Sequence, residues 1–395
     1  MIAEHSDPGD LVLDPFCGSG VAPIEAAILG RRAVGVDLNP FAVFLASRTA
    51  AACDPDMVEA AAGRVIAAAR QREQAWHTTR CRLCGQEASL AATARSGDVV
   101  TAVVVRCHHC RQARRETPSR EDLVLERSAQ RAGDGDAPRP PVPAGWQTRK
   151  LARAGISDFG GLFTQRNLRA LAAIRTGIMA EQAGVVRDLL LLALTGALAQ
   201  ASRMMADHST AGGGASWKIN IYWLPERSLE LDPFRCFENR VARILAAKRE
   251  TQHVIADPPY GGEGIQYAEL SALWCGWLDP PLAAPLADEI GENPTHGRDA
   301  AAYASALRDA FLSVRRVLAD DGEMTVTFAS SRPASWRALR EALDAAGFAV
   351  TDEQSLSRSA PAITQHTTRR ATRHDVWLSC RPSRAGQAEA SAQSP

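Results

Sequence analysis

Short apolar runs, a glycine turn and a helical pattern open the chain. Residues 11–14 form the first apolar run, residues 15–20 hold the turn, and apolar residues then recur at helical spacing to Ile28. A second apolar run over 32–37 ends on an acid. This order of strand, glycine turn, helix and strand predicts the start of a doubly wound α/β sheet.

Hydrophobic periodicity also predicts helices and strands in the rest of the chain. Residues 162–201 follow a helical pattern, and the alternation of helix and strand after residue 232 predicts the second half of an α/β sheet. The further predicted helices span 40–52, 55–75, 232–250, 300–318 and 334–346, and the predicted strands span 99–106, 253–257, 323–329, 348–354 and 374–380.

Composition and charge narrow the class of protein. The 395 residues carry 45 Lys+Arg against 45 Asp+Glu, so any nucleic-acid site must be a local basic patch. The polar, acidic first ten residues exclude a secretory signal peptide, and the apolar run Leu189–Ala201 is too short to span a bilayer. We therefore expect a cytoplasmic protein that does not engage a membrane.

Four of the nine cysteines have the spacing of a zinc ribbon. An odd number of cysteines argues against a disulfide framework. Two C-x2-C pairs separated by 22 residues place two thiolates on each of two turns, which a hairpin can bring together around one ion. We predict a closed, structural Zn²⁺ site, with His108 and His109 facing solvent, formed by Cys81, Cys84, Cys107 and Cys110.

A local basic cluster surrounds the second cysteine pair. Two interpretations stay open, because such a cluster suits a phosphate backbone but also occurs as an ordinary solvated charge run. Its members are Arg106, Arg111, Arg114 and Arg115.

The glycine turn predicts a cofactor site. Glycines let a ligand approach the backbone where a strand passes into a helix, whose first amides are free donors. Asp37 ends the next strand, where a carboxylate can accept from two ribose hydroxyls. The third glycine of a pyrophosphate fingerprint is absent, and an acid before the turn suits the cationic amino-acid end of S-adenosylmethionine. The candidate residues are Asp14, Pro15, Phe16, Cys17, Gly18, Ser19, Gly20, Asp37, Leu38 and Asn39.

These motifs carry a family resemblance. DPFCGSG at 14–20 with EAAILGRRAVGVDLNPFA resembles motif I and the following acidic strand of amino-group methyltransferases, and ADPPYG at 256–261 resembles their catalytic motif IV. The string DPPYGGEGIQYAELSALWCGWL, the segment FTQRNLRAL (163–171) and the cysteine ribbon are similar to bacterial adenine-specific DNA methylases that contain a zinc ribbon. The resemblance implies a Rossmann-like methyltransferase sheet interrupted by a ribbon and a helical insertion.

The resemblance also implies roles for the second motif. Asp257 and the carbonyl of Pro258 would accept the two hydrogens of an exocyclic amine, while Pro259 stiffens the turn. Tyr260 would stack on a base flipped out of the duplex. Asp at the first position is usual for adenine N6, whereas Ser is more usual for cytosine N4.

The resemblance divides the chain as follows. Substrate recognition would fall between the ribbon and the second motif, with Gln165, Arg166, Arg203, His208, Trp217 and Lys218 as candidate contacts. The predicted limits are 1–75 (first methyltransferase half), 76–133 (ribbon insert), 134–149 (Pro/Gly linker), 150–231 (helical recognition region), 232–382 (second half) and 383–395 (disordered tail).

Two features depart from the family pattern. Only 13 residues precede Asp14, so motif X is either upstream of Met1 or replaced by a later segment such as 361–380. Helix 232–250 leads directly into the predicted strand 253–257, which leaves no room for the strand and acid that usually contact the cofactor's adenine. We expect weaker cofactor binding than in an intact relative.

Three functions are therefore weighed. The first is an S-adenosylmethionine-dependent, adenine-specific DNA methyltransferase of a restriction-modification or defence system. It would act on a flipped adenine, and partner subunits of that system are among its expected partners. The second is an RNA guanine-N2 methyltransferase, since those enzymes carry similar motifs. The third is a catalytically weakened relative that binds DNA through the ribbon.

Overall fold

The computed structural model describes most of the chain and supports the predicted mixed α/β class. The described residues are 2–133, 135–208, 215–216, 221–250, 267–278, 280–286, 288–318, 322–330, 332–357 and 374–383. They form two compact units. One holds the described residues up to 39, Tyr267 and those from 285 onward, and the other holds those of 40–250 and 268–284.

The amino-terminal part of the first unit follows the predicted order of elements. Strands β1 (Leu11–Asp14) and β2 (Arg32–Gly35) pair in parallel, with Leu11 opposite Arg32, and helix α2 (Val21–Ile28) connects them. A short helix α1 (Ile2–His5) precedes β1. The carboxyl ends of both strands therefore meet at one edge, where the glycine turn begins.

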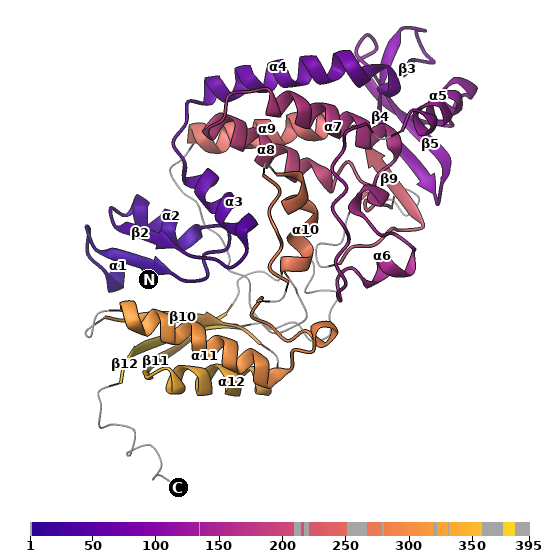
Figure 1. Cartoon of the computed structure of the whole chain (residues 1–395). Helices are drawn as coiled ribbons and strands as arrows, with labels where there is room; N and C mark the ends of the chain where they lie inside the picture. Colours follow the sequence, from indigo (N-terminus) through magenta and orange to yellow (C-terminus); the bar gives the residue numbers. More distant parts are fainter. Residues whose placement is uncertain are drawn as a thin grey trace. The chain divides into compact units, whose positions relative to one another are not determined.

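The carboxyl-terminal part of the first unit is an antiparallel sheet in the order β10-β12-β11. Helices α11 and α12 cover one face of it (Figure 1), around buried Phe311, Leu339 and Leu378. The sequence predicted all five elements, which are α11 (Ala300–Val317), β10 (Met324–Phe328), α12 (Pro333–Ala345), β11 (Phe348–Ser357) and β12 (His374–Pro382).

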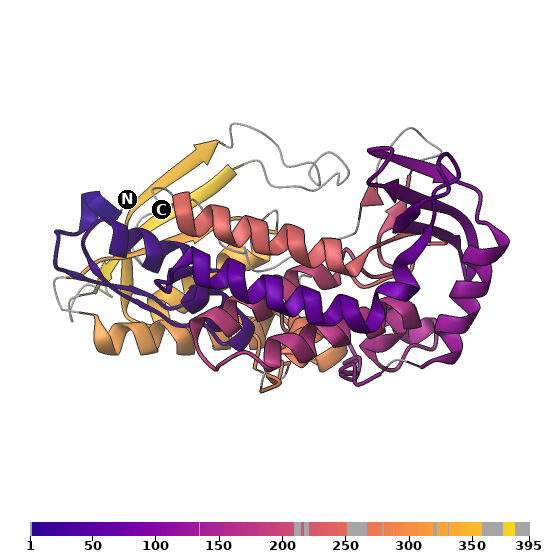
Figure 2. The ribbon, with the colours of Figure 1, turned by 90° about the horizontal axis from the view of Figure 1, so that it is seen from above.

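The second unit has a helical core. Helix α4 lies along α7 and α9 (Figure 2), and Leu168, Leu171 and Ile174 of α7 are fully buried in this core. Asp54 caps α4 by accepting from Asp56 N, with Pro55 at the first helical position. The helices are α3 (Pro40–Ala50), α4 (Pro55–Glu73), α7 (Gln165–Met179), α8 (Val185–Leu198), α9 (Pro233–Glu250) and α10 (Tyr267–Trp277).

The cysteine region forms a seven-stranded sheet in this unit. Its order is β6-β5-β4-β9-β7-β8, with β3 paired to β4, and the predicted strand at 99–106 is the middle of this hairpin meander. The strands are β3 (Thr78–Arg80), β4 (Glu87–Ser96), β5 (Val99–Cys107), β6 (Gln112–Glu116), β7 (Ala206–Asp207), β8 (Ala215–Ser216) and β9 (Arg227–Leu231).

Helix α5 (Arg120–Arg131) and strand β9 were not predicted from the sequence. α5 begins with a capping box, in which Ser119 and Asp122 bond each other's backbone, and this S-x-x-D signal was readable in the sequence. β9 is a five-residue strand that reaches the ribbon from more than one hundred residues away. The remaining short elements are η1 (Gln74–His77), α6 (Arg149–Arg153), η2 (Phe159–Leu162) and η4 (Pro294–His296).

The contacts group the chain differently from the predicted limits. α3, α4 and α9 pack in the second unit, although the sequence placed residues 40–75 and 232–250 with the methyltransferase halves. The predicted strand 253–257 and the glycine loop at 212–214 lie outside the described residues. Among the helices that the structure describes, none has both the length and the apolar character needed to cross a membrane.

Candidate cofactor, metal and nucleic-acid sites

The glycine turn between β1 and α2 has the backbone shape expected of a ligand loop. Gly18 and Gly20 adopt φ angles of +48° and +88°, which disfavour any side chain with a β-carbon. Gly20 directly precedes the first turn of α2, where backbone amides are free to donate. The turn therefore offers amide donors at a strand-to-helix junction.

Asp37 ties the turn to the end of β2. One of its carboxylate oxygens accepts from Gly18 N at 2.8 Å, and the other accepts from Asn39 N at 2.7 Å. Asp14, at the end of β1, accepts from Phe16 N at 3.1 Å. The structure thus brings together the two acids and the glycines that the sequence placed at one site.

Burial and the two carboxylates raise pKa values at this site. Burial raises the pKa of Asp14, and the nearby charge of Asp37 adds to the increase. Burial, Asp37 and Asp14 together raise the pKa of Cys17 to about 11, so this thiol stays protonated near neutral pH. A β-carbon on Gly35 would lie 3.0 Å from the Cys17 β-carbon, so Cys17 packs closely against the end of β2.

The other candidate cofactor residues differ in how far they are exposed to solvent. Phe16 is 42% exposed and Leu38 is 49% exposed, so both apolar side chains remain open to a ligand. Ser19 is exposed and Pro15 is half-buried. All ten candidate cofactor residues are thus on the turn or at the end of β2, whereas Asp257, Pro258, Pro259 and Tyr260 lie outside the described residues.

The four ribbon cysteines form one compact cluster. Their sulfur atoms all lie within 4.8 Å of one another, with Cys81 Sγ 3.8 Å from Cys110 Sγ and Cys84 Sγ 3.6 Å from Cys107 Sγ. Four thiolates bound to one tetrahedral ion at about 2.3 Å would stand about 3.8 Å apart. The donor set and its spacing therefore fit a Zn²⁺ ion, and His108 and His109 are exposed, as predicted.

The protonation of these thiols is linked to their neighbours. Backbone amides of Cys84 and Leu83 lower the pKa of Cys81 to about 7. The hydrogen bond with Cys84 and the other sulfur atoms raise the pKa of Cys110 to about 12. Four thiolates this close repel one another, so the cluster needs a cation to hold them all deprotonated.

The arginines beside the second cysteine pair differ in their partners. Arg115 Nη2 lies 2.8 Å from the carboxylate of Asp207, so this arginine has a role within the protein. The side chains of Arg106, Arg111 and Arg114 have no ion pair or hydrogen bond within the described residues. Arg111 and Arg114 are exposed and therefore available to an external anion, whereas Arg106 is half-buried.

Arg111 also has an unusual backbone. Its φ of +54° is the sole positive value of a non-glycine residue in the described chain, whereas Gly85, which follows the first cysteine pair, has φ +71°. The two residues occupy equivalent positions after C-x2-C. The left-handed conformation costs about 1–2 kcal/mol for a residue with a β-carbon, so Arg111 stands where glycine would be locally more favourable.

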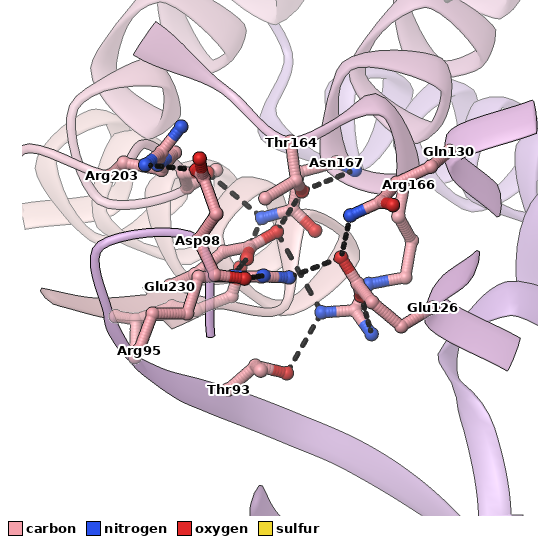
Figure 3. Close-up of polar contacts among 12 residues, drawn as sticks. Thr93, Arg95, Asp98, Glu126, Gln130, Thr164, Arg166, Asn167, Arg203 and Glu230 are labelled. Carbon is pink, nitrogen blue, oxygen red and sulfur yellow. Dashed lines mark hydrogen bonds and ion pairs between the residues drawn. The ribbon is translucent and has the colours of Figure 1, made fainter. Parts of the chain in front are cut away.

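Arg166, one of the predicted nucleic-acid contacts, is instead part of a buried ionic cluster, which we call the charged junction. The junction joins the ribbon sheet to α5 and α7 and consists of Arg95, Glu126, Arg166 and Glu230 (Figure 3). Arg166 is only 4% exposed, so no base edge can reach it.

The contacts within the junction are reciprocal. Arg95 bonds Glu126 and lies 3.0 Å from Glu230, while Arg166 lies 3.4 Å from Glu126 and donates to Thr93 Oγ1 at 2.8 Å. Burial by itself would raise the pKa of Glu126, but Arg166 and Arg95 reverse this and hold it below its ordinary value. Each buried charge is thus compensated inside the protein.

The other predicted contacts have mixed outcomes. Arg203 pairs with Asp98 at 2.8 Å, Gln165 is half-buried and His208 is exposed. Trp217 and Lys218 lie outside the described residues. In the segment FTQRNLRAL, Thr164 caps α7, and Asn167 Nδ2 donates to the carbonyls of Ala201 and Leu231. This segment holds the second unit together.

The predicted linker 134–149 contains buried, fixed residues. Gln147 and Thr148 are at most 1% exposed, whereas Trp146 between them and the proline run is 51% exposed. The prolines and glycines that predicted a linker give no sign that the polar residues after them are buried. A tryptophan followed by Arg149 and Lys150 was the signal that could have marked this segment.

Comparison with known proteins gives a result for the amino-terminal part of the chain. Residues 1–48 match the profile of a family described as DNA methylase. A stretch of 42 residues is 48% identical to the type II methyltransferase M.EcaI of Enterobacter cloacae. The match covers 11% of this chain and 9% of that protein. No solved structure matches. The residues that form the glycine turn are therefore similar to those of DNA methylases.

Proposed function

We propose that the protein is an S-adenosylmethionine-dependent DNA methyltransferase that modifies adenine N6. The observation that carries this proposal is the glycine turn with Asp37 bonded against it, in the part of the chain that is similar to DNA methylases. Restriction-modification or defence is the setting that the type II relative favours.

The turn has the groups that this cofactor needs. Asp37 would accept from the ribose hydroxyls, Asp14 would face the cationic amino-acid end, and Phe16 and Leu38 would contact the adenine ring. Bound S-adenosylmethionine supplies an electrophilic methyl group on a sulfonium. The elevated pKa of Cys17 agrees with a reaction that uses no thiol nucleophile.

The second motif would hold the target amine. Asp257 and the Pro258 carbonyl would accept the two amine hydrogens, Pro259 would fix both acceptors, and Tyr260 would stack on the flipped base. The Asp at the first position favours adenine over cytosine N4. A Rossmann-like sheet that includes this motif, split by the ribbon insertion, is part of the proposal.

The ribbon would hold one structural Zn²⁺ through its four cysteines. A closed tetrahedral site leaves no position for water, so the ion would stabilise the sheet and take no part in methyl transfer. Metal analysis should find about one zinc per chain, lost in Cys84→Ser, while Cys53→Ser, which changes a thiol outside the cluster, should keep the ion. Retention of zinc in Cys84→Ser would contradict the proposed ligand set.

The activity is tested by tritium transfer from labelled S-adenosylmethionine to DNA and to tRNA, with Asp257→Ala as the inactive control. Label on DNA adenine, abolished in Asp257→Ala, is the expected result. Label on DNA cytosine would overturn the base assignment, and label on tRNA would favour the RNA guanine-N2 alternative. A shift of DNA mobility in a gel, without transfer of tritium to DNA or tRNA, would favour a relative that only binds DNA.

A further inference from the structure

An exposed tryptophan stands on a rigid loop of the second unit. Trp146 is 51% exposed, yet its neighbours Gln147 and Thr148 are at most 1% exposed. Large aromatic side chains usually bury most of their surface. An ordered loop that holds such a ring in solvent is therefore unusual.

The loop is fixed by a buried carboxylate. Glu269 on α10 is fully buried and accepts from Gln147 N at 2.9 Å. A β-carbon on Gly145 would lie 1.9 Å from the Glu269 carboxyl carbon, so only glycine fits at this position. Tyr222 N donates to Gln147 O at 3.0 Å, and Thr148 Oγ1 donates to Pro143 O at 2.6 Å. Both sides of Trp146 are thus anchored before any ligand binds.

Cations accompany the ring. The Arg149 guanidinium lies 3.2 Å from the centre of the Trp146 ring and donates to the Trp146 carbonyl at 2.9 Å. Lys150 Nζ lies 5.4 Å from the centre of the Trp223 ring. Arg149, Lys150 and Arg153 have no carboxylate partner within the described residues. In the neutral chain, residues 137–157 contain no acidic residue at all.

We propose that Trp146 and Arg149 form a stacking platform for a DNA base, with Lys150 and Arg153 contacting the adjoining backbone. The inference rests on the proposed function for the choice of DNA. Aromatic rings beside unpaired cations are the usual means of binding nucleic-acid strands, since every base has a π-face and every linkage has a charge. The fixed loop lowers the entropy that such a contact would otherwise cost.

Titration of the intact protein with fluorescent duplex DNA tests the platform. Trp146→Ala should weaken binding by roughly 5- to 150-fold, the usual range for loss of one stacked base, while Trp146→Phe should stay within about threefold because phenylalanine also stacks. Arg149→Ala should weaken binding more than Arg153→Ala, a matched change of charge one turn away. Thermal unfolding of all variants should stay close to that of the parent, because Trp146 and Arg153 are exposed and Arg149 is half-buried with no carboxylate partner within the described residues.

The outcomes separate this inference from the proposed function. Unchanged affinity in Trp146→Ala would overturn the platform even if methyl transfer to DNA occurs. Loss of affinity in that variant, without methyl transfer by the parent, would support the platform and overturn the activity. Tighter binding of RNA of the same sequence would overturn the choice of DNA, and no binding of DNA by the parent would overturn the platform itself.

Discussion

The charged junction and the glycine turn both place carboxylates beside hydrogen-bond donors, but their physical character is opposite. In the junction, Arg95, Arg166, Glu126 and Glu230 are each at most 6% exposed and are paired with one another. In the turn, Asp37 bonds two backbone amides while Phe16 and Leu38 stay largely exposed. The first region stabilises the fold, and the second has the open groups that a ligand needs.

The difference shows how a resemblance in sequence should be interpreted. Arg166, which the sequence offered as a nucleic-acid contact, packs against carboxylates that are buried with it. Gly18, in the part of the chain that is similar to DNA methylases, has a backbone shape that a ligand can approach. Four substitutions test the difference between the charged junction and the glycine turn, and they are ordered by their expected effect on stability.

The largest effect is expected from Arg166→Ala. The change leaves the carboxylates of Glu126 and Glu230 with Arg95 as their remaining cation, and removing one partner of a buried ion pair costs about 3–5 kcal/mol. Urea unfolding should report the loss. Arg127→Ala removes an exposed arginine beside Glu126 and should change stability by less than about 0.5 kcal/mol. Equal stability of the two variants would contradict a structural role for the junction.

A pH-dependent effect is expected at Asp232, which follows β9. Burial raises its pKa from 3.8 to about 6, so the folded protein holds this proton more tightly than the unfolded chain. The stabilisation contributed by the protonated Asp232 carboxyl is fully present below pH 3.8 and is lost as the pH rises through about 6. Asp232→Asn should thus gain about 1–3 kcal/mol at pH 8 and almost nothing at pH 4, measured by urea unfolding. A gain that is independent of pH would contradict this assignment.

A smaller effect on stability is expected from Asp37→Ala. The Gly18 and Asn39 amides lose their acceptor at a partly exposed site, where water can replace it, at a cost of about 0.5–1.5 kcal/mol. Binding of S-adenosylmethionine, followed by calorimetry, should fall at least about tenfold, because two charge-assisted ribose contacts disappear. Severe loss of stability with unchanged cofactor affinity would mean that Asp37 is a structural residue and not a cofactor contact.

The smallest change is expected from Arg111→Gly, and its sign is opposite. Relief of the left-handed conformation should raise stability by about 1 kcal/mol, while loss of one phosphate contact should reduce the salt dependence of DNA binding by about one unit of slope. Gly85→Ala, at the equivalent position, should lose about 1 kcal/mol. A destabilised Arg111→Gly variant with normal DNA binding would make Arg111 a structural residue.

The strongly periodic elements could be predicted from the sequence. The helices α4, α9 and α11 and the strands β5 and β10 were expected within a few residues, because their apolar positions repeat at the proper spacing. The grouping of the four cysteines followed from their spacing and from the hairpin between them. The shape of the glycine turn followed from its residue types.

The contacts between distant segments could not be predicted. Arg166 was interpreted as a nucleic-acid contact because nothing in its local sequence tells that Glu126 and Glu230 fold against it. β9 was missed because five residues, RSLEL, give too short an alternation to mark a strand. The fixed loop at Trp146 was missed because its anchor, Glu269, lies far along the chain.

The pairing of β9 with β4 has a practical consequence. Residues 92–96 of β4 bond residues 227–231 of β9, so the sheet around the cysteines is completed by chain from outside the ribbon sequence. A fragment cut at the ribbon limits would expose an unpaired, alanine-rich strand edge, which invites association with other chains. The cysteine ribbon therefore cannot be transplanted as an independent cassette, and a domain exchange with a relative would have to carry both segments together.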